Sequence, residues 1–103
     1  MPNQTASPDR KTVIRAELLR RAKAGQTINY GEAAKMVGLA AQGLGKILDE
    51  IGAEEASENR PDLACLVVNA RTGFPGYIGA GEDERRNALA VREAVFKVHG
   101  FAP

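Results

Sequence analysis

The chain has 103 residues and a mass of 11.0 kDa, which suits one compact domain and excludes a two-domain enzyme. Its 44% hydrophobic and 26% charged residues are typical of a globular protein and exclude a fibrous repeat or a wholly disordered chain. One cysteine and one histidine exclude an internal disulfide and a zinc cluster. No apolar stretch approaches the roughly 20 residues of a membrane helix. We therefore expect a cytoplasmic protein with no membrane contact, metal or cofactor.

The formal net charge of +1 hides an uneven distribution of charge along the chain. Residues 1–46 carry eight basic and three acidic side chains, whereas residues 47–62 carry one basic and six acidic ones. A basic half favours a polyanion such as DNA as partner, but helix faces that are simply solvated give the same pattern. Both interpretations stay open on charge alone.

Local signals predict a helix and a short strand in the first part of the chain. Residues 1–7 are expected to be disordered and residues 8–103 to form a single domain. The sequence Ser7-Pro8-Asp9 is typical of a helix start, and the apolar spacing that follows predicts a helix up to Gly25. Gln26–Asn29 is then a short extended segment.

Two further helices are predicted next. Tyr30 begins a helix that ends near Gly38, and a third helix runs from Ala41 to about Ile51. The third helix contains two glycines, each of which costs up to about 1 kcal/mol relative to alanine. The acidic stretch Gly52–Asn59 is expected to be a linker.

The remaining part of the chain predicts a hairpin and a last helix. The apolar run Leu63–Asn69 indicates a buried strand, Ala70–Gly76 a turn-rich loop and Tyr77–Ile78 a brief returning strand. A final helix runs from Glu82 to Gly100. This order predicts a mainly α fold with a small β-hairpin, namely a winged helix-turn-helix with an added C-terminal helix.

The spacing of small and apolar residues between Tyr30 and Asp49 favours a helix-turn-helix. Such a motif needs a small residue where the helices approach, a residue tolerant of unusual dihedral angles at the turn, and an apolar anchor. Ala34, Gly38 and Leu44 have these properties at the required spacing. The flanking apolar anchors are Val37, Leu39 and Ile47. An ordinary helical hairpin with a glycine break is the alternative.

Five residues are candidates for DNA contact. On the outward side of the third helix, Gln42 can pair with an adenine edge, Gly43 permits close approach of the backbone, and Lys46 suits a phosphate. In the loop of the predicted hairpin, Arg71 adds phosphate affinity and Thr72 can donate to an oxyanion. Each of them also has a plainer interpretation as a surface or turn residue.

Three segments point to a known family. Thr27–Ala34 resembles the Thr-x-x-Tyr-Gly-acid-x-Ala entry of the C-terminal DNA-binding domain of O6-alkylguanine-DNA alkyltransferases and alkyltransferase-like proteins. Gln42–Leu48 is similar to the recognition helix of that family, and Pro61–Gly76 to its active-site strand and following loop. The resemblance implies that Tyr30 contacts the target phosphate. It also implies that Gln42 stands where the family has the arginine that fills the space left by a flipped base.

The resemblance places Cys65 near the methyl-accepting cysteine of the family, but Leu66 stands where the family has histidine. A thiol without an adjacent base is mostly protonated at neutral pH, so we expect no enzymatic activity. The leading hypothesis is a non-catalytic DNA-binding protein. The second hypothesis is a protein-interaction module that uses the acidic arm 49–62. The third and weakest is cysteine-dependent repair of alkylated DNA.

Overall fold

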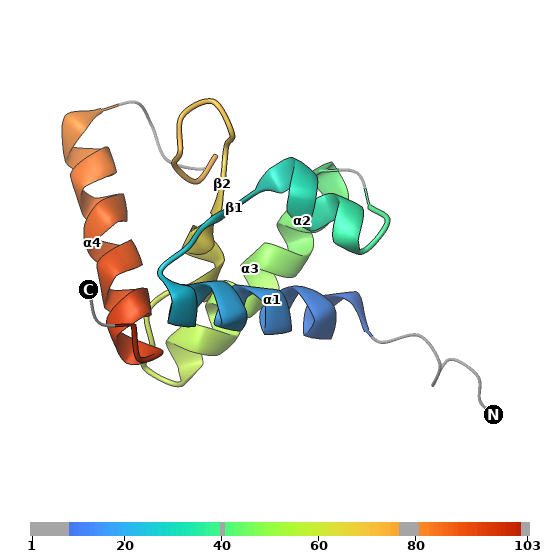
Figure 1. Ribbon diagram of the computed structural model, residues 1–103, viewed down its shortest axis with the longest axis horizontal. Coiled ribbons are helices and arrows are strands. Elements are labelled where there is room, and N and C mark those ends of the chain that lie inside the picture. The colour runs from blue at the N-terminus through green and yellow to red at the C-terminus, as the bar shows by residue number, and fades with distance from the viewer. Residues whose placement is uncertain (1–8, 40, 77–80, 102–103) are drawn as a thin grey trace.

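The computed structural model describes residues 9–39, 41–76 and 81–101 (Figure 1). The described part is mainly helical with one small parallel sheet, which confirms the expected fold class of helices with a small β element. In chain order the elements are α1 (Arg10–Ala24), β1 (Ile28–Asn29), α2 (Tyr30–Met36), α3 (Ala41–Ser57), the 3-10 helix η2 (Leu63–Leu66), β2 (Val67–Val68) and α4 (Glu82–Val98). The segment 1–7, predicted to be disordered, lies outside the described residues.

Helix α1 begins and ends at local capping signals. The side chain of Asp9 caps the helix, because its carboxylate accepts a hydrogen bond from the backbone N–H of Lys11 at 3.4 Å. Gly25 ends the helix with a φ of 69°, a left-handed conformation that glycine adopts without strain. The buried stripe of α1 consists of Ile14, Leu18 and Ala22.

The α2–α3 pair has the packing that the spacing predicted. A capping box starts α2, in which Asn29 Oδ1 accepts from the N–H of Glu32 at 2.8 Å and the Glu32 side chain accepts from the N–H of Asn29. Gly38 has a φ of 69° in the turn, while Ala34 and Leu44 are buried at 4% and 0% exposure. The three positions therefore have the predicted roles in joining the two helices.

The predicted end of the third helix is wrong, because α3 continues from Ile51 to Ser57 through most of the expected acidic linker Gly52–Asn59. Ile51 and Glu55 continue the buried stripe of the helix at 0% and 1% exposure. The helix ends where Asn59 adopts a φ of 58° and the N–H of Arg60 bonds to the carbonyl of Glu55 at 2.9 Å. A run of carboxylates suggested a linker, but tertiary contacts hold it helical.

The predicted strand Leu63–Asn69 is also shorter than expected. Leu63–Leu66 forms a 3-10 turn, which Asp62 caps by accepting from the N–H of Ala64 at 2.9 Å, and only Val67–Val68 is extended. An apolar run that is buried on all sides gives no periodicity with which to separate these two conformations. The described strands β1 and β2 pair in parallel, Ile28 with Val67. The expected returning strand at 77–78, and with it the hairpin, lies outside the described residues.

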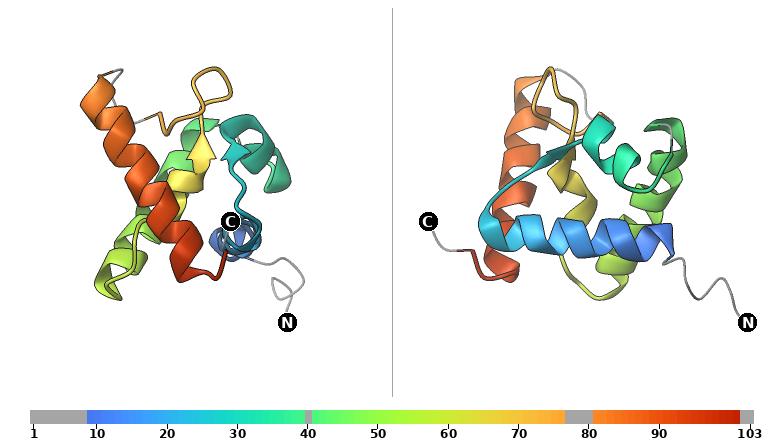
Figure 2. Two further views of the ribbon diagram at one scale, coloured as in Figure 1. Left: turned by 60° about the vertical axis from the view of Figure 1, so that its left-hand side comes forward. Right: turned by 45° about the vertical axis from the view of Figure 1, so that its right-hand side comes forward.

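The arrangement of the elements separates two ends of the molecule (Figures 1 and 2). Helix α1 and the C-terminal half of α3 lie toward one end. The loop after β2 (residues 69–76), α2 and the N-terminal ends of α3 and α4 lie toward the other. Between them the core gathers around η2, with the fully buried side chains Ile14, Leu18, Leu44, Ile51, Leu63, Leu66, Val67 and Val95.

Candidate nucleic-acid interface

Helix α3 leaves one face uncovered. Gly43, Lys46 and Asp49 are exposed along this face, while Leu44 and Leu48 turn into the core at 0% and 8% exposure. We call the three exposed positions the outer face of α3. Gln42 belongs to the first turn of the same helix, and its side chain lies outside the described part of the structure.

Tyr30 connects α2 to the 69–76 loop. It is the first residue of α2 and is partly buried against the core. Its hydroxyl oxygen accepts a hydrogen bond from the backbone N–H of Gly76 at 3.0 Å, and a Cβ added to Gly76 would lie 3.4 Å from that oxygen. The hydroxyl hydrogen of Tyr30 has no acceptor in this contact and can be donated to an outside oxygen.

The 69–76 loop is a tightly bonded turn that exposes Arg71 and Thr72. Asn69 Oδ1 accepts from the N–H of Arg71 at 2.8 Å, and the carbonyl of Asn69 accepts from the N–H of Gly73 at 2.8 Å. Thr72 Oγ1 accepts from the N–H of Phe74 at 3.1 Å, so this hydroxyl is already engaged inside the loop. The Arg71 guanidinium has no hydrogen-bond or ion-pair partner in the described part of the chain.

Lys46 and Gly43 line an open groove of about 940 Å³ between α1 and the α2–α3 turn. Arg10 stands on the opposite wall, where its Nε donates to the carbonyl of Val37 at 3.0 Å and so satisfies the end of α2. The floor of the groove is apolar and includes Leu39 and Ile47. Lys46 therefore lies on the α1 side of the outer face of α3.

A smaller pocket of about 360 Å³ lies on the other side of α3, beside Tyr30. Gly45, Asp49 and Asp62 line it, which gives it an acidic character. A Cβ added to Gly45 would meet nothing within 4 Å, whereas one added to Gly52 would lie 3.0 Å from Asp62 Oδ1. Close packing thus accounts for the glycine at 52 but not for the one at 45.

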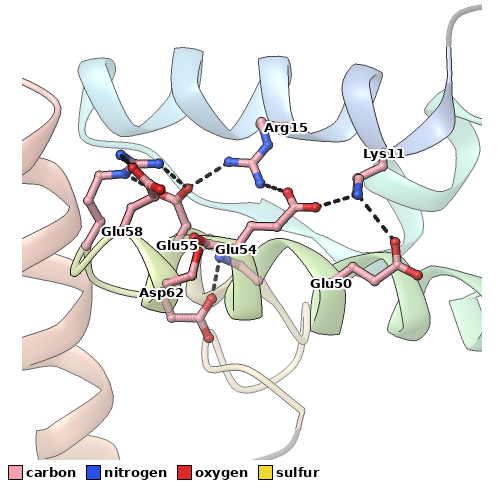
Figure 3. Close-up of polar contacts among 10 residues, drawn as sticks. Lys11, Arg15, Glu50, Glu54, Glu55, Glu58 and Asp62 are labelled. Atoms are coloured by element: carbon pink, nitrogen blue, oxygen red, sulfur yellow. Dashed lines mark hydrogen bonds and ion pairs between the residues drawn. The ribbon is translucent and has the colours of Figure 1, made fainter.

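The basic and acidic segments of the sequence meet in a row of ion pairs between α1 and α3 (Figure 3). Lys11 Nζ lies 3.5 Å from a carboxylate oxygen of Glu50 and is also bonded to Glu54. Arg15 is bonded to Glu54, and its Nη1 donates to Glu55 Oε2 at 2.8 Å. The acidic half of α3 therefore faces α1, away from the outer face.

Glu55 is the buried member of this row. Arg60 also donates to it, from Nε and Nη2 at 3.0 Å each. Hydrogen bonds from Arg60 and Arg15 lower the pKa of Glu55 to about 2, against the opposing effect of burial. The carboxylates most available to an outside partner in the acidic arm are Asp49 and Glu58, since the others that face α1 are engaged within the chain.

Three cations near the two ends of the α2–α3 unit have no carboxylate partner among the described residues: Lys35, Lys46 and Arg71. By contrast, Arg20 and Arg21 on α1 share the carboxylate of Glu17. The basic excess of residues 1–46 is thus mostly used inside the molecule. The structure brings Tyr30 and the 69–76 loop together, whereas Lys46 lines the groove on the other side of α3.

Cys65 is a buried thiol. It is 2% exposed within η2, and burial, with a smaller contribution from Asp62, raises the pKa of its thiol to about 12. At neutral pH the thiol is protonated and enclosed, which is the opposite of what a nucleophile needs.

Comparison with known proteins finds no match: no family model, no curated protein and no solved structure matches the chain. Within residues 9–39, 41–76 and 81–101, no three His, Cys, Asp or Glu side chains come together in a way that could hold a metal ion. None of the helices in that part of the chain is both long and apolar enough to cross a membrane.

Two residues that the sequence did not mark as candidates lie beside the loop. Arg85 and Arg92 of α4 both stack on Phe74, with guanidinium carbons 5.0 and 5.6 Å from the ring centroid. The sequence does place both arginines on one face of the last helix, because they are seven positions apart. It gave no sign that this face lies against Phe74 of the predicted loop.

Proposed function

We propose that this chain is a non-catalytic DNA-binding protein of winged-helix type, which contacts duplex or distorted DNA through the outer face of α3 and the 69–76 loop. One observation carries the proposal. The carboxylates in the C-terminal half of α3 pair with α1, while Lys46 and Arg71 remain exposed and without a carboxylate partner among the described residues. Glu54 and Glu55 are thereby turned toward α1, whereas Asp49 stays on the face that would meet a phosphate backbone.

Each candidate residue has a definite contact in this proposal. Lys46 and Arg71 neutralise phosphates on either side of the entry point of α3. Gly43 leaves the helix backbone open to close approach, and Tyr30 donates its free hydroxyl hydrogen to a phosphate oxygen. Gln42, by the resemblance, is the residue that reaches base edges or the space beside them.

The proposed binding depends more on the phosphate backbone and on DNA shape than on base sequence. The outer face of α3 carries no arginine, and arginine paired with guanine is the commonest specific contact in the major groove. Asp49 adds a negative charge beside Tyr30. We therefore expect modest affinity that falls steeply with salt concentration.

The buried state of Cys65 argues for binding without chemistry. A family member that transfers an alkyl group needs a thiolate that the lesion can reach, and this thiol has a pKa of about 12 and 2% exposure. A protein-interaction role for the acidic arm 49–62 would depend mainly on Asp49 and on the 62% exposed Glu58, since Glu50, Glu54 and Glu55 are paired with cations of the same chain.

The experiment is a fluorescence anisotropy titration of a labelled 20-base-pair duplex at low and moderate salt. We expect binding by the wild-type protein that weakens with salt and a loss of about tenfold or more for the Lys46→Ala, Arg71→Ala double variant. The matched control is Lys23→Ala with Lys97→Ala, which removes two exposed cations elsewhere. No binding at low salt, or equal losses for the two double variants, would overturn the proposal.

A further inference from the structure

We propose that Arg85 and Arg92 of α4, stacked on Phe74, form a second binding site for backbone phosphates of the nucleic acid. The inference rests on the proposed function and extends it to an element outside the helix-turn-helix. It starts from the position of Phe74, which follows Arg71 and Thr72 in the 69–76 loop. The N-terminal half of α4 lies toward the same end of the molecule as that loop and the start of α3 (Figure 1).

The contacts orient both guanidinium groups. The Arg85 and Arg92 guanidinium carbons lie 5.0 and 5.6 Å from the Phe74 ring centroid, within the range of cation–π attraction. Arg92 also donates from Nη2 to the carbonyl of Gly73 at 2.6 Å. Stacking and this hydrogen bond reduce the freedom of two long side chains before any ligand arrives.

The donors of this pair are left largely without acceptors. Arg85 has no hydrogen-bond or ion-pair partner among the described residues, and the Nε atoms of both arginines are buried without one. On α1, in contrast, Arg15 and Arg21 are each bonded to a carboxylate. Two cations beside one ring repel each other, and a shared anion would relieve this repulsion.

A phosphate is the anion that fits these groups best. The planar fork of a guanidinium matches two phosphate oxygens, and the terminal Nη groups of Arg85 carry no hydrogen bond among the described residues. Among the acids at the start of α4, Glu82 and Asp83 bond to Arg86, at 3.7 and 3.0 Å. The cluster lies beside the loop that carries Arg71, so one strand passing the loop can meet both sites.

The alternative is that Arg85 and Arg92 only hold the loop in place. The two roles differ in the salt dependence of binding, since each phosphate contact contributes about 0.9 to the slope of log affinity against log salt concentration. If an arginine only positions the loop, its replacement lowers the affinity but removes no phosphate contact made by that arginine itself. The slope is therefore the measurement that separates the two roles.

The test is Arg85→Gln, with Arg86→Gln as the matched control on the next position of α4, titrated against the same duplex over a range of salt. We expect Arg85→Gln to lower the slope by about 0.9 and the affinity by about fivefold. Arg86→Gln is expected to change neither. Arg85→Lys, which keeps the charge, is expected to restore most of the slope, and circular dichroism checks that each variant is folded.

The outcomes distinguish the two proposals. If the wild-type protein binds and Arg85→Gln keeps the wild-type slope, the phosphate site is wrong and the proposed function stands. The same holds if Arg86→Gln lowers the slope as much as Arg85→Gln does. If the wild-type protein does not bind the duplex at low salt, both proposals fail together.

Discussion

Arg15 of α1 donates to the buried carboxylate of Glu55 in α3 at 2.8 Å, which joins two helices whose residues lie 40 positions apart in the chain. Glu55 is 1% exposed and also receives two hydrogen bonds from Arg60. The pair explains why an acidic segment is helical and why it does not face the candidate DNA surface.

Glu55→Gln is expected to lower the free energy of unfolding by about 2 to 4 kcal/mol, because it leaves two guanidinium groups facing a buried neutral side chain. Glu58→Gln is the control, since its side chain is 62% exposed and lies 3.8 Å from Arg60. We expect a change below about 0.5 kcal/mol for the control. Urea denaturation followed by circular dichroism measures both, and equal effects would contradict the prediction.

The same carboxylate predicts a loss of stability in acid. Hydrogen bonds from Arg60 and Arg15 hold the pKa of Glu55 at about 2 in the folded protein, whereas the ordinary pKa of a glutamate is 4.5. A carboxyl group whose pKa is lowered by folding stabilises the protein above its unfolded pKa, and this contribution is lost as the pH falls from about 4.5 to about 2.

The measurement is the free energy of unfolding between pH 2 and 6 for the wild-type protein and Glu55→Gln. The difference between them is expected to shrink by up to about 1.4 kcal/mol per pH unit below pH 4.5. Glu17, whose pKa is also about 2 because of Arg20 and Arg21, titrates in both proteins and cancels in the difference. Parallel curves over this range would show that Glu55 is not the group responsible.

Gly25→Ala is expected to destabilise the protein by more than Gly38→Ala. Both glycines have a φ of 69°, so alanine costs about 1 kcal/mol at either position. At Gly25 the new Cβ would also lie 2.5 Å from the ring of Phe101, whereas at Gly38 it would meet nothing within 4 Å. Thermal unfolding measures the difference, which we expect to be at least about 1 kcal/mol.

Cys65 is expected to resist alkylation in the folded protein. Its thiol has a pKa of about 12 and is 2% exposed, so iodoacetamide at pH 7.5 should modify it only after unfolding. Mass spectrometry in the presence and absence of denaturant measures the modification. Transfer of a methyl group from an O6-methylguanine duplex to Cys65 would contradict both this prediction and the non-catalytic proposal.

Asp49→Asn is expected to raise the affinity for duplex DNA about two- to fivefold at low salt, because it removes a negative charge from the outer face of α3. Glu58→Gln removes the same charge just beyond the C-terminal end of α3 and is expected to change the affinity little. Anisotropy titrations of the two variants give the comparison. Equal gains would mean that net charge, rather than the position of Asp49, sets the affinity.

Signals between close neighbours in the chain were enough to predict where each helix begins and where α1 and α2 end. The capping residue Asn29, the left-handed glycines at 25 and 38 and the apolar spacing around Leu44 act within one or two helical turns. They therefore have the same meaning in the isolated sequence and in the folded protein. The exposure of Gly43 and Lys46 followed from the same periodicity.

Contacts between distant segments required the folded chain. Ile28 and Val67 pair in parallel, and Tyr30 bonds to Gly76, although the residues of each pair lie 39 or more positions apart in the chain. The length of α3 depends in the same way on Arg15 and Glu55, which lie 40 positions apart. The run of carboxylates has one basic neighbour in the sequence, Arg60, so its composition predicted a linker. Packing supplied the arginines that neutralise it, because burial of the apolar stripes of α1 and α3 brings those side chains together at short distance.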